Sequence, residues 1–163
     1  MGFLFGKSRI DIQERERCSA YLQEELRISK LFEEPRNKIK KLGEQLSNAE
    51  ADAQLIRRIQ AKLTRIITLT NELIKERRNM TPIPQPAISL FTAWEQVYVA
   101  FRELARGLRK DLDPDTTIPI GPYLLSKYQE IFHKAYNEHG KLVRRLKLCD
   151  DEKEALLGNW DSF

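Results

Sequence analysis

Apolar side chains recur every three or four residues along three blocks of this chain, and two proline-rich clusters separate the blocks. The clusters are TPIPQP at 81–86 and DPDTTIPIGP at 113–122. Proline ends regular helices because it removes a backbone donor and fixes φ. Between the clusters, one apolar stripe alternates spacings of four and three: Leu90, Trp94, Val97, Phe101, Leu104 and Leu108. This period predicts an amphipathic helix over about 87–112, with its aromatic side chains at the centre of the core.

A second stripe runs through the last block. Its members are Leu125, Tyr128, Phe132, Ala135, His139, Leu142, Leu146 and Cys149. Because the stripe continues past Gly140, we expect one helix from Pro122 to about residue 149, and proline suits the first helical position. A short further helix over 151–157 is an option, begun by Asp150 or Asp151 and ended at Gly158.

The first block, about 8–80, is too long for one element. Pro35 disfavours helical geometry at the residue before it, and Ser8-x-x-Asp11 and Ser47-x-x-Glu50 both resemble helix caps. A break is therefore expected at 33–36, at 46–48, or at both. A near-heptad apolar register runs from Ile39 to Ile74 across Ser47, and it favours a helix over 8–33 followed by one long helix over 36–79.

These elements predict an all-α fold, an antiparallel four-helix bundle whose long second helix is straight or kinked, with a short C-terminal helix as an option. The length of 163 residues is that of a single domain. That domain would span 1–163, with an apolar N-terminal tail at 1–7 and an apolar C-terminal tail at 158–163.

Bulk composition narrows the function classes only slightly. The chain has 28 basic and 24 acidic residues and a formal net charge of +4, which permits nucleic acid or an anionic surface as a partner without requiring either. No apolar run reaches the length of a membrane-spanning helix. Cys18 and Cys149 lack ligand spacing and are typical of free thiols in a reducing compartment, so a cytoplasmic location is expected.

The chain offers little for catalysis or metal binding. Glu130-x-x-His133 matches the helical motif of di-iron carboxylate bundles, but such a site needs a second copy, and Tyr136 precedes His139 at the corresponding position. His139 lies on the apolar stripe, where a hydrogen-bonded core histidine is expected. Glycine-rich phosphate loops are absent from the sequence. We therefore expect no catalytic residue, cofactor or metal, and a protein that is not an enzyme.

Basic side chains supply the strongest binding hypothesis. Arg58, Lys62 and Arg65 share one helical face at i, i+4 and i+7, a spacing that could follow a phosphate backbone. Two further groups fall near predicted helix C-termini, where cations also offset the helix dipole: Lys75, Arg77 and Arg78, and Arg144, Arg145 and Lys147. Alternating helix directions would bring these two groups to one positive end of the bundle.

Both chain ends carry apolar side chains that could contact a partner, a membrane or the protein's own core. They are Phe3, Leu4 and Phe5 in MGFLFGKS, and Trp160 and Phe163 in LLGNWDSF. The stretch MGFLFGK resembles the leader of some ESCRT-III-type membrane-remodelling subunits, in which a long helical hairpin follows. The resemblance covers seven residues; that family's strongly basic first helix is not matched, because residues 9–33 are charge-balanced.

The leading hypothesis is a non-enzymatic helical interaction or scaffold protein. It would self-associate through helix 36–79, where apolar surface on 36–56 lacks a partner in the predicted bundle, and through the apolar ends. One alternative is a helical nucleic-acid-binding module that uses the basic faces. The other is a peripheral membrane protein held weakly by residues 2–7. No small-molecule substrate is evident.

Overall fold

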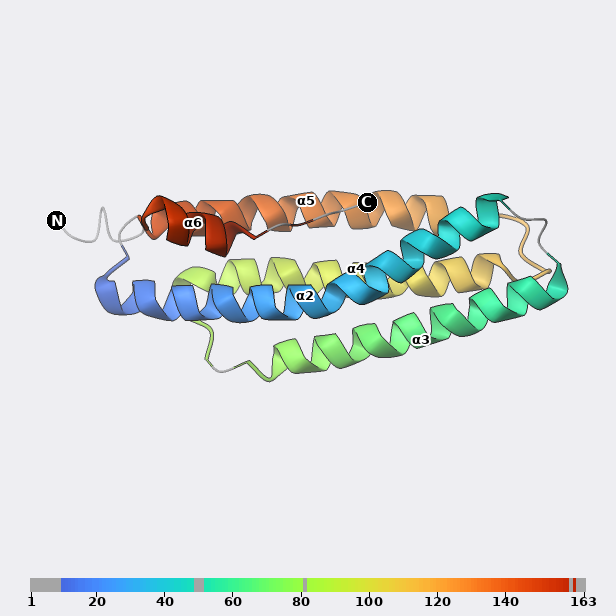
Figure 1. Ribbon diagram of the computed structural model, residues 1–163, viewed down its shortest axis with the longest axis horizontal. Helices are drawn as coiled ribbons and strands as arrows, with labels where there is room; N and C mark the ends of the chain where they lie inside the picture. The colour runs from blue at the N-terminus through green and yellow to red at the C-terminus, as the bar shows by residue number, and fades with distance from the viewer. Residues whose placement is uncertain (1–9, 49–51, 81, 159, 161–163) are drawn as a thin grey trace.

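The fold is a bundle of four long helices with one short helix at its end, seen in a computed structural model that describes residues 10–48, 52–80, 82–158 and 160. The helices are α2 (Ile12–Asn48), α3 (Ala53–Arg78), α4 (Ile88–Asp111), α5 (Gly121–Arg145) and α6 (Asp150–Leu157), with a 3-10 turn, η1 (Gln85–Ala87), before α4. The long helices alternate in direction, and α6 folds back beside α5 (Figure 1). An all-α antiparallel four-helix bundle with a short C-terminal helix is therefore confirmed.

The boundaries predicted in the first block are wrong. α2 continues through Pro35 to Asn48, so there is no break at 33–36, no helix over 8–33 and no long helix over 36–79. α3 begins at Ala53 after Asp52, whose side chain accepts a hydrogen bond of 2.7 Å from the Leu55 amide. The true break thus lies just beyond the alternative site at 46–48, and Asp52 rather than Ser47 is the cap.

Packing on both sides of Pro35 explains why α2 continues. A proline inside a helix costs about 3 kcal/mol, because it removes one hydrogen bond and crowds the carbonyl four residues earlier. That residue, Leu31, lies on the outer side of α2 with 47% of its surface exposed. Phe32 and Ile39 are buried before and after the proline, and α2 changes direction in its second half (Figure 1). Burial of this apolar face outweighs the local cost.

The start of α2 also differs from the prediction. Ile10 and Asp11 are not helical, and the Asp11 side chain accepts a hydrogen bond of 2.7 Å from the Glu14 amide. Asp11 is therefore the N-cap, and the predicted cap Ser8 lies outside the described residues.

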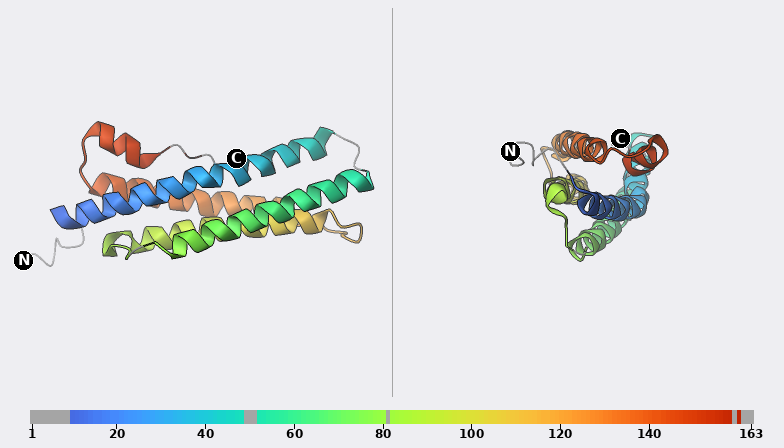
Figure 2. Two further views of the ribbon diagram at one scale, coloured as in Figure 1. Left: turned by 60° about the horizontal axis from the view of Figure 1, so that its bottom comes forward. Right: turned by 90° about the vertical axis from the view of Figure 1, so that its left-hand side faces the viewer.

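α4 forms the centre of the bundle. It packs against both α3 and α5, while α6 lies at the seam between α2 and α5, as the end-on view of Figure 2 shows. Trp94, Tyr98 and Phe101 of α4 are fully buried, and Phe32 of α2 contacts Tyr98 and Phe101 at centroid distances of 4.4 and 4.8 Å. The predicted aromatic centre is confirmed for these residues.

The C-terminal segment reverses direction after α5. The helix passes through Gly140 as predicted but ends at Arg145 rather than near 149. Lys147 has a positive φ of 52°, which turns the chain, so Cys149 leaves the apolar stripe and is exposed. α6 ends at Gly158, whose φ of 69° is one that glycine adopts without strain. The short C-terminal helix and its end at Gly158 are confirmed.

Candidate functional site

An apolar hollow of about 380 Å³ opens at the end of the bundle where α2 ends and α5 begins. All four long helices line it, chiefly with aliphatic side chains: Ile39, Leu42 and Leu46 of α2, Ile59 and Leu63 of α3, Leu104 and Leu108 of α4, and Pro122 and Leu125 of α5. Among the described residues, Lys40 is the one charged residue in this lining. Gly43 and Gly121 also line the hollow and contribute no side chain, and a Cβ added at Gly43 would meet open space.

Three exposed apolar side chains lie at the same end of the bundle, close in sequence to the lining residues Gly121 and Pro122. Ile118 and Tyr123 have 78% and 65% of their surface exposed, and Ile120 is also exposed. The turn that carries them is held by Asp111, whose carboxylate accepts hydrogen bonds from the amides of Ile120 and Gly121 at 2.9 and 2.6 Å. We call the hollow and these three side chains the distal apolar surface.

The apolar surface expected on residues 36–56 is largely covered. Ile39 and Leu42 are buried against the other helices, and Leu46 and Leu55 pack partly against the core. The prediction that this surface lacks a partner was wrong because α2 ends at Asn48 and α3 begins at Ala53, so that two helices pack against each other where one long helix was expected.

The basic residues do not form one surface. Arg58, Lys62 and Arg65 are exposed along α3, as their spacing predicted. Lys75, Arg144 and Lys147 are also exposed, and Arg145 is half-buried. Arg78 forms an ion pair of 3.0 Å with Glu95. α3 and α5 both end toward the same end of the bundle but lie on opposite sides of it, with α2 and α4 between them (Figure 2), so the two cationic groups are not brought together.

Arg77 is fully buried, and this corrects its assignment to a basic surface. Its guanidinium donates two hydrogen bonds to Glu25 of α2, at 2.7 and 2.9 Å, and a third of 3.0 Å to the carbonyl of Phe91. The Tyr21 hydroxyl donates to the same carboxylate at 2.5 Å, and the guanidinium lies 4.5 and 5.2 Å from the ring centroids of Phe91 and Tyr98. One buried charge pair thus joins α2, α3 and α4.

The protonation states of this network follow from its partners. Burial alone would lower the pKa of Arg77, but the hydrogen bonds and negative charge of Glu25 raise it above its ordinary value. Burial, followed by the charge of Glu25, raises the pKa of Tyr21, which stays neutral and donates. The charged pair and the neutral phenol are the states that satisfy these contacts.

Sequence reasoning missed this pair, although a signal was present. Glu25 continues the buried stripe of Cys18, Leu22 and Phe32 on α2, and Arg77 continues the stripe of Ile66, Leu73 and Ile74 on α3. A charged residue at a position that the helical period assigns to the core predicts a buried partner of opposite charge.

His139 connects α4, α5 and α6. Its Nδ1 lies 3.2 Å from the Trp94 Nε1, and its Nε2 lies 2.7 Å from the Leu156 carbonyl oxygen. An indole N–H only donates and a carbonyl only accepts, so Nδ1 accepts and Nε2 carries the proton. The expected hydrogen-bonded core histidine is confirmed. Burial lowers its pKa, against smaller opposing effects of the Leu156 carbonyl and the Glu25 charge.

Because His139 is buried and neutral, we expect the free energy of unfolding to fall in acid. The ordinary histidine pKa is 6.5, so below that pH the unfolded chain binds a proton that the folded protein excludes. Stability contributed by neutral His139 is full above pH 6.5 and is lost as the pH falls below it, with a slope of up to about 1.4 kcal/mol per pH unit. Urea unfolding at pH 7.5 and 5.5 measures this loss. His133→Gln, at an exposed site, should retain it and His139→Gln should reduce it; equal slopes in the two variants would contradict the assignment.

The two chain ends are described in part. Trp160 stacks on Trp94 with a centroid distance of 4.1 Å and an interplanar angle of 16°, and its Nε1 donates to the Leu157 carbonyl at 2.9 Å. The C-terminal segment therefore packs on its own bundle at this residue. Phe3, Leu4, Phe5 and Phe163 lie outside the described residues.

The described residues show neither a metal centre nor a membrane span. Glu130 and His133 are both exposed, and no group of three or more His, Cys, Asp or Glu side chains in the described ranges could hold a metal ion. Within the same ranges, every helix is too short or too polar to cross a bilayer.

Comparison of the chain with protein-family models, with curated proteins and with solved structures gave no match.

Proposed function

We propose that this protein is a non-enzymatic helical scaffold that self-associates through the distal apolar surface. The observation that supports the proposal is that one end of the bundle carries both an aliphatic hollow and exposed apolar side chains, Ile118 and Tyr123. A twofold-symmetric dimer needs a patch that complements itself. Two copies related in this way would each insert the turn of residues 118–123 into the hollow of the other.

Burial of exposed aliphatic and aromatic side chains would drive this association. Fully burying one such side chain is worth about 1.5–3 kcal/mol, and a contiguous exposed apolar patch commonly marks an interaction site. The described residues contribute one charged side chain, that of Lys40, to the lining of the hollow, so the described lining adds little polar desolvation to oppose docking. A cytoplasmic location belongs to the same proposal, because both cysteines are free thiols.

Ile118→Glu is expected to weaken self-association by at least tenfold in the dimer dissociation constant, because it places a carboxylate in the apolar contact. Sedimentation velocity measures the species present. Ile88→Glu is the matched control, since Ile88 is an exposed apolar residue at the start of α4, at the other end of the bundle. Equal effects of the two substitutions, or none, would contradict the proposed interface.

A second candidate function is phosphate-driven nucleic-acid binding along α3. Arg58, Lys62 and Arg65 are exposed, and none of the three forms an ion pair with another described residue. Neighbouring Lys41 of α2 and Arg57 of α3 are exposed at the same end of the bundle. Binding of a short duplex that weakens steeply with salt would favour this function, whereas sedimentation with anionic vesicles that depends on residues 2–7 would favour the membrane alternative.

A further inference from the structure

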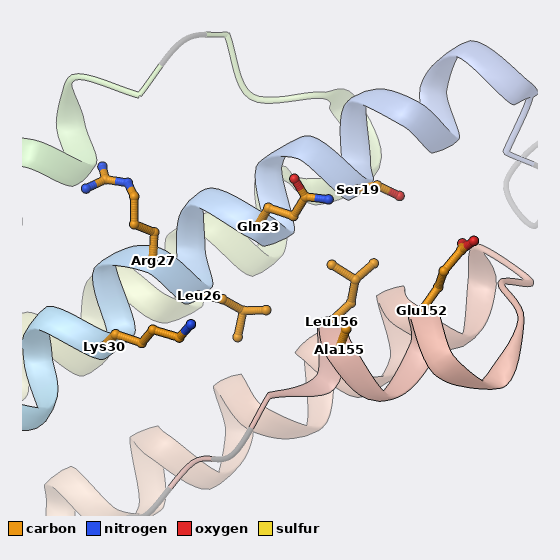
Figure 3. Close-up of a pocket in the computed structure, with 8 residues that line it drawn as sticks. All are labelled: Ser19, Gln23, Leu26, Arg27, Lys30, Glu152, Ala155 and Leu156. Carbon is orange, nitrogen blue, oxygen red and sulfur yellow. The ribbon is translucent and has the colours of Figure 1, made fainter.

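A second groove runs along the first half of α2, between that helix and α6. Its inner part has a volume of about 390 Å³ and is lined by Ser19, Gln23, Leu26, Arg27 and Lys30 of α2 and by Glu152, Ala155 and Leu156 of α6. Figure 3 shows Leu26 and Leu156 pointing towards one another across it, with polar side chains along the rim. An adjoining hollow shares Ser19, Gln23 and Glu152 and extends to Ile12, Glu16 and Leu148. We call the two together the α2–α6 groove.

This groove has an apolar floor and a charged rim. Leu26, Ala155 and Leu156 form the inner floor, while Ile12, with 71% of its surface exposed, lies at the outer end. From Ile12 to Lys30 the groove is about 27 Å long at the helical rise of 1.5 Å per residue. These dimensions suit a short extended peptide with a few apolar anchors.

We propose that residues 1–9 of the same chain occupy the α2–α6 groove, running back along α2 with Phe3, Leu4 and Phe5 over its inner floor. The segment joins the described chain at Ile10, which packs against the core and lies two residues before Ile12 at the outer end of the groove. Phe5 and Phe3 are five and seven residues before Ile10, a reach of about 17–25 Å for extended chain. Leu26 lies 14 residues beyond Ile12, about 21 Å along the helix.

The length of the segment also limits where it can bind. Lys7 is three residues before Ile10, a reach of about 10 Å, which places it over the outer part of the groove. That part is lined by the acidic side chains of Glu16 and Glu152 and by the basic side chains of Arg15 and Lys147, so the placement rests on the reach of the segment and not on charge. The apolar hollow at the distal end does not suit the same segment, because Leu42 lies 30 residues beyond Ile12, about 45 Å along α2.

Disulfide trapping tests this placement. Leu4→Cys and Ala155→Cys are combined with Cys149→Ser, which removes the exposed native thiol, and both Ala155 and Cys149 are exposed, so the core is unchanged. A disulfide needs Cα atoms within about 7 Å. Mild oxidation should give an intramolecular disulfide, seen as a monomer of shifted mobility on a non-reducing gel that reverts on reduction. The matched control pairs Leu4→Cys with Lys62→Cys, exposed on α3 and outside both the groove and the distal apolar surface, and should stay reduced.

Three results would overturn the proposal. Equal trapping in the test and control pairs would show a segment with no preferred place. A disulfide-linked dimer instead of a monomer would assign the groove to the segment of a second copy. Sedimentation of the unmodified chain with phosphatidylcholine–phosphatidylserine vesicles, lost in Leu4→Ser/Phe5→Ser, would assign the apolar side chains to a bilayer.

Discussion

Replacing Arg77 by methionine is expected to lower the free energy of unfolding by about 3–5 kcal/mol, because the substitution leaves a buried carboxylate without its partner. Glu25 is fully buried and accepts two hydrogen bonds from Arg77 and one from Tyr21. Methionine retains much of the side-chain volume, so the loss reports on the charge pair rather than on a cavity. Urea unfolding at pH 7.5 measures it.

Two companion variants separate the pair from general effects on α3. Arg78→Met removes an exposed cation from the next position and should change stability by less than about 1 kcal/mol. Glu25→Leu combined with Arg77→Met removes both charges and should recover most of the loss, because apolar replacements of a buried pair are often well tolerated. A loss in the double variant equal to the sum of the single losses would show that the two side chains act independently, contrary to the structure.

Replacing Trp94 by alanine is expected to lower the free energy of unfolding by about 3–5 kcal/mol, the range for deleting a buried tryptophan. The indole is fully buried. It contacts Phe132 at a centroid distance of 5.7 Å, stacks on Trp160 and donates a hydrogen bond to His139. The loss therefore combines a large cavity with an unpaired nitrogen on His139, and thermal or urea unfolding measures it.

Trp160→Ala is the matched control, because it removes the other ring of the same stack from a half-buried position. Its loss should be clearly smaller than that of Trp94→Ala. Trp94→Phe should fall between the two, since it keeps an aromatic ring but loses the donor to His139. If both tryptophan-to-alanine variants unfold with equal free energies, α4 does not provide the centre of the core.

The long helices could be predicted from sequence where the apolar period was uninterrupted. The stripe from Leu90 to Leu108 placed α4 within a residue or two, and the stripe through Gly140 correctly joined the two halves of α5. The break in the first block was misplaced because Pro35 is a local signal, whereas the burial of Phe32 and Ile39 that overrides it is a tertiary effect. Asp52, which caps the start of α3, lies five residues beyond Ser47, the predicted cap.

The candidate sites were harder to predict from the sequence than the helices. Spacing correctly placed Arg58, Lys62 and Arg65 on an exposed face, but it could not distinguish Arg77, which turns into the core, from its neighbours at the end of α3. The distal hollow arises where four segments distant in sequence meet, and two of its lining positions are glycines that carry no apolar signal. Such surfaces depend on packing between helices, which the apolar period along one helix does not encode.

Amide hydrogen exchange at low and high protein concentration tests self-association through the distal apolar surface. The turn over 113–120 connects α4 and α5 and carries Ile118 and Ile120, so its amides report on contact at that surface. If the protein self-associates through this surface, exchange in this turn slows as concentration rises, while exchange in the connection over 82–87 stays constant. Identical exchange at both concentrations throughout the turn would contradict it.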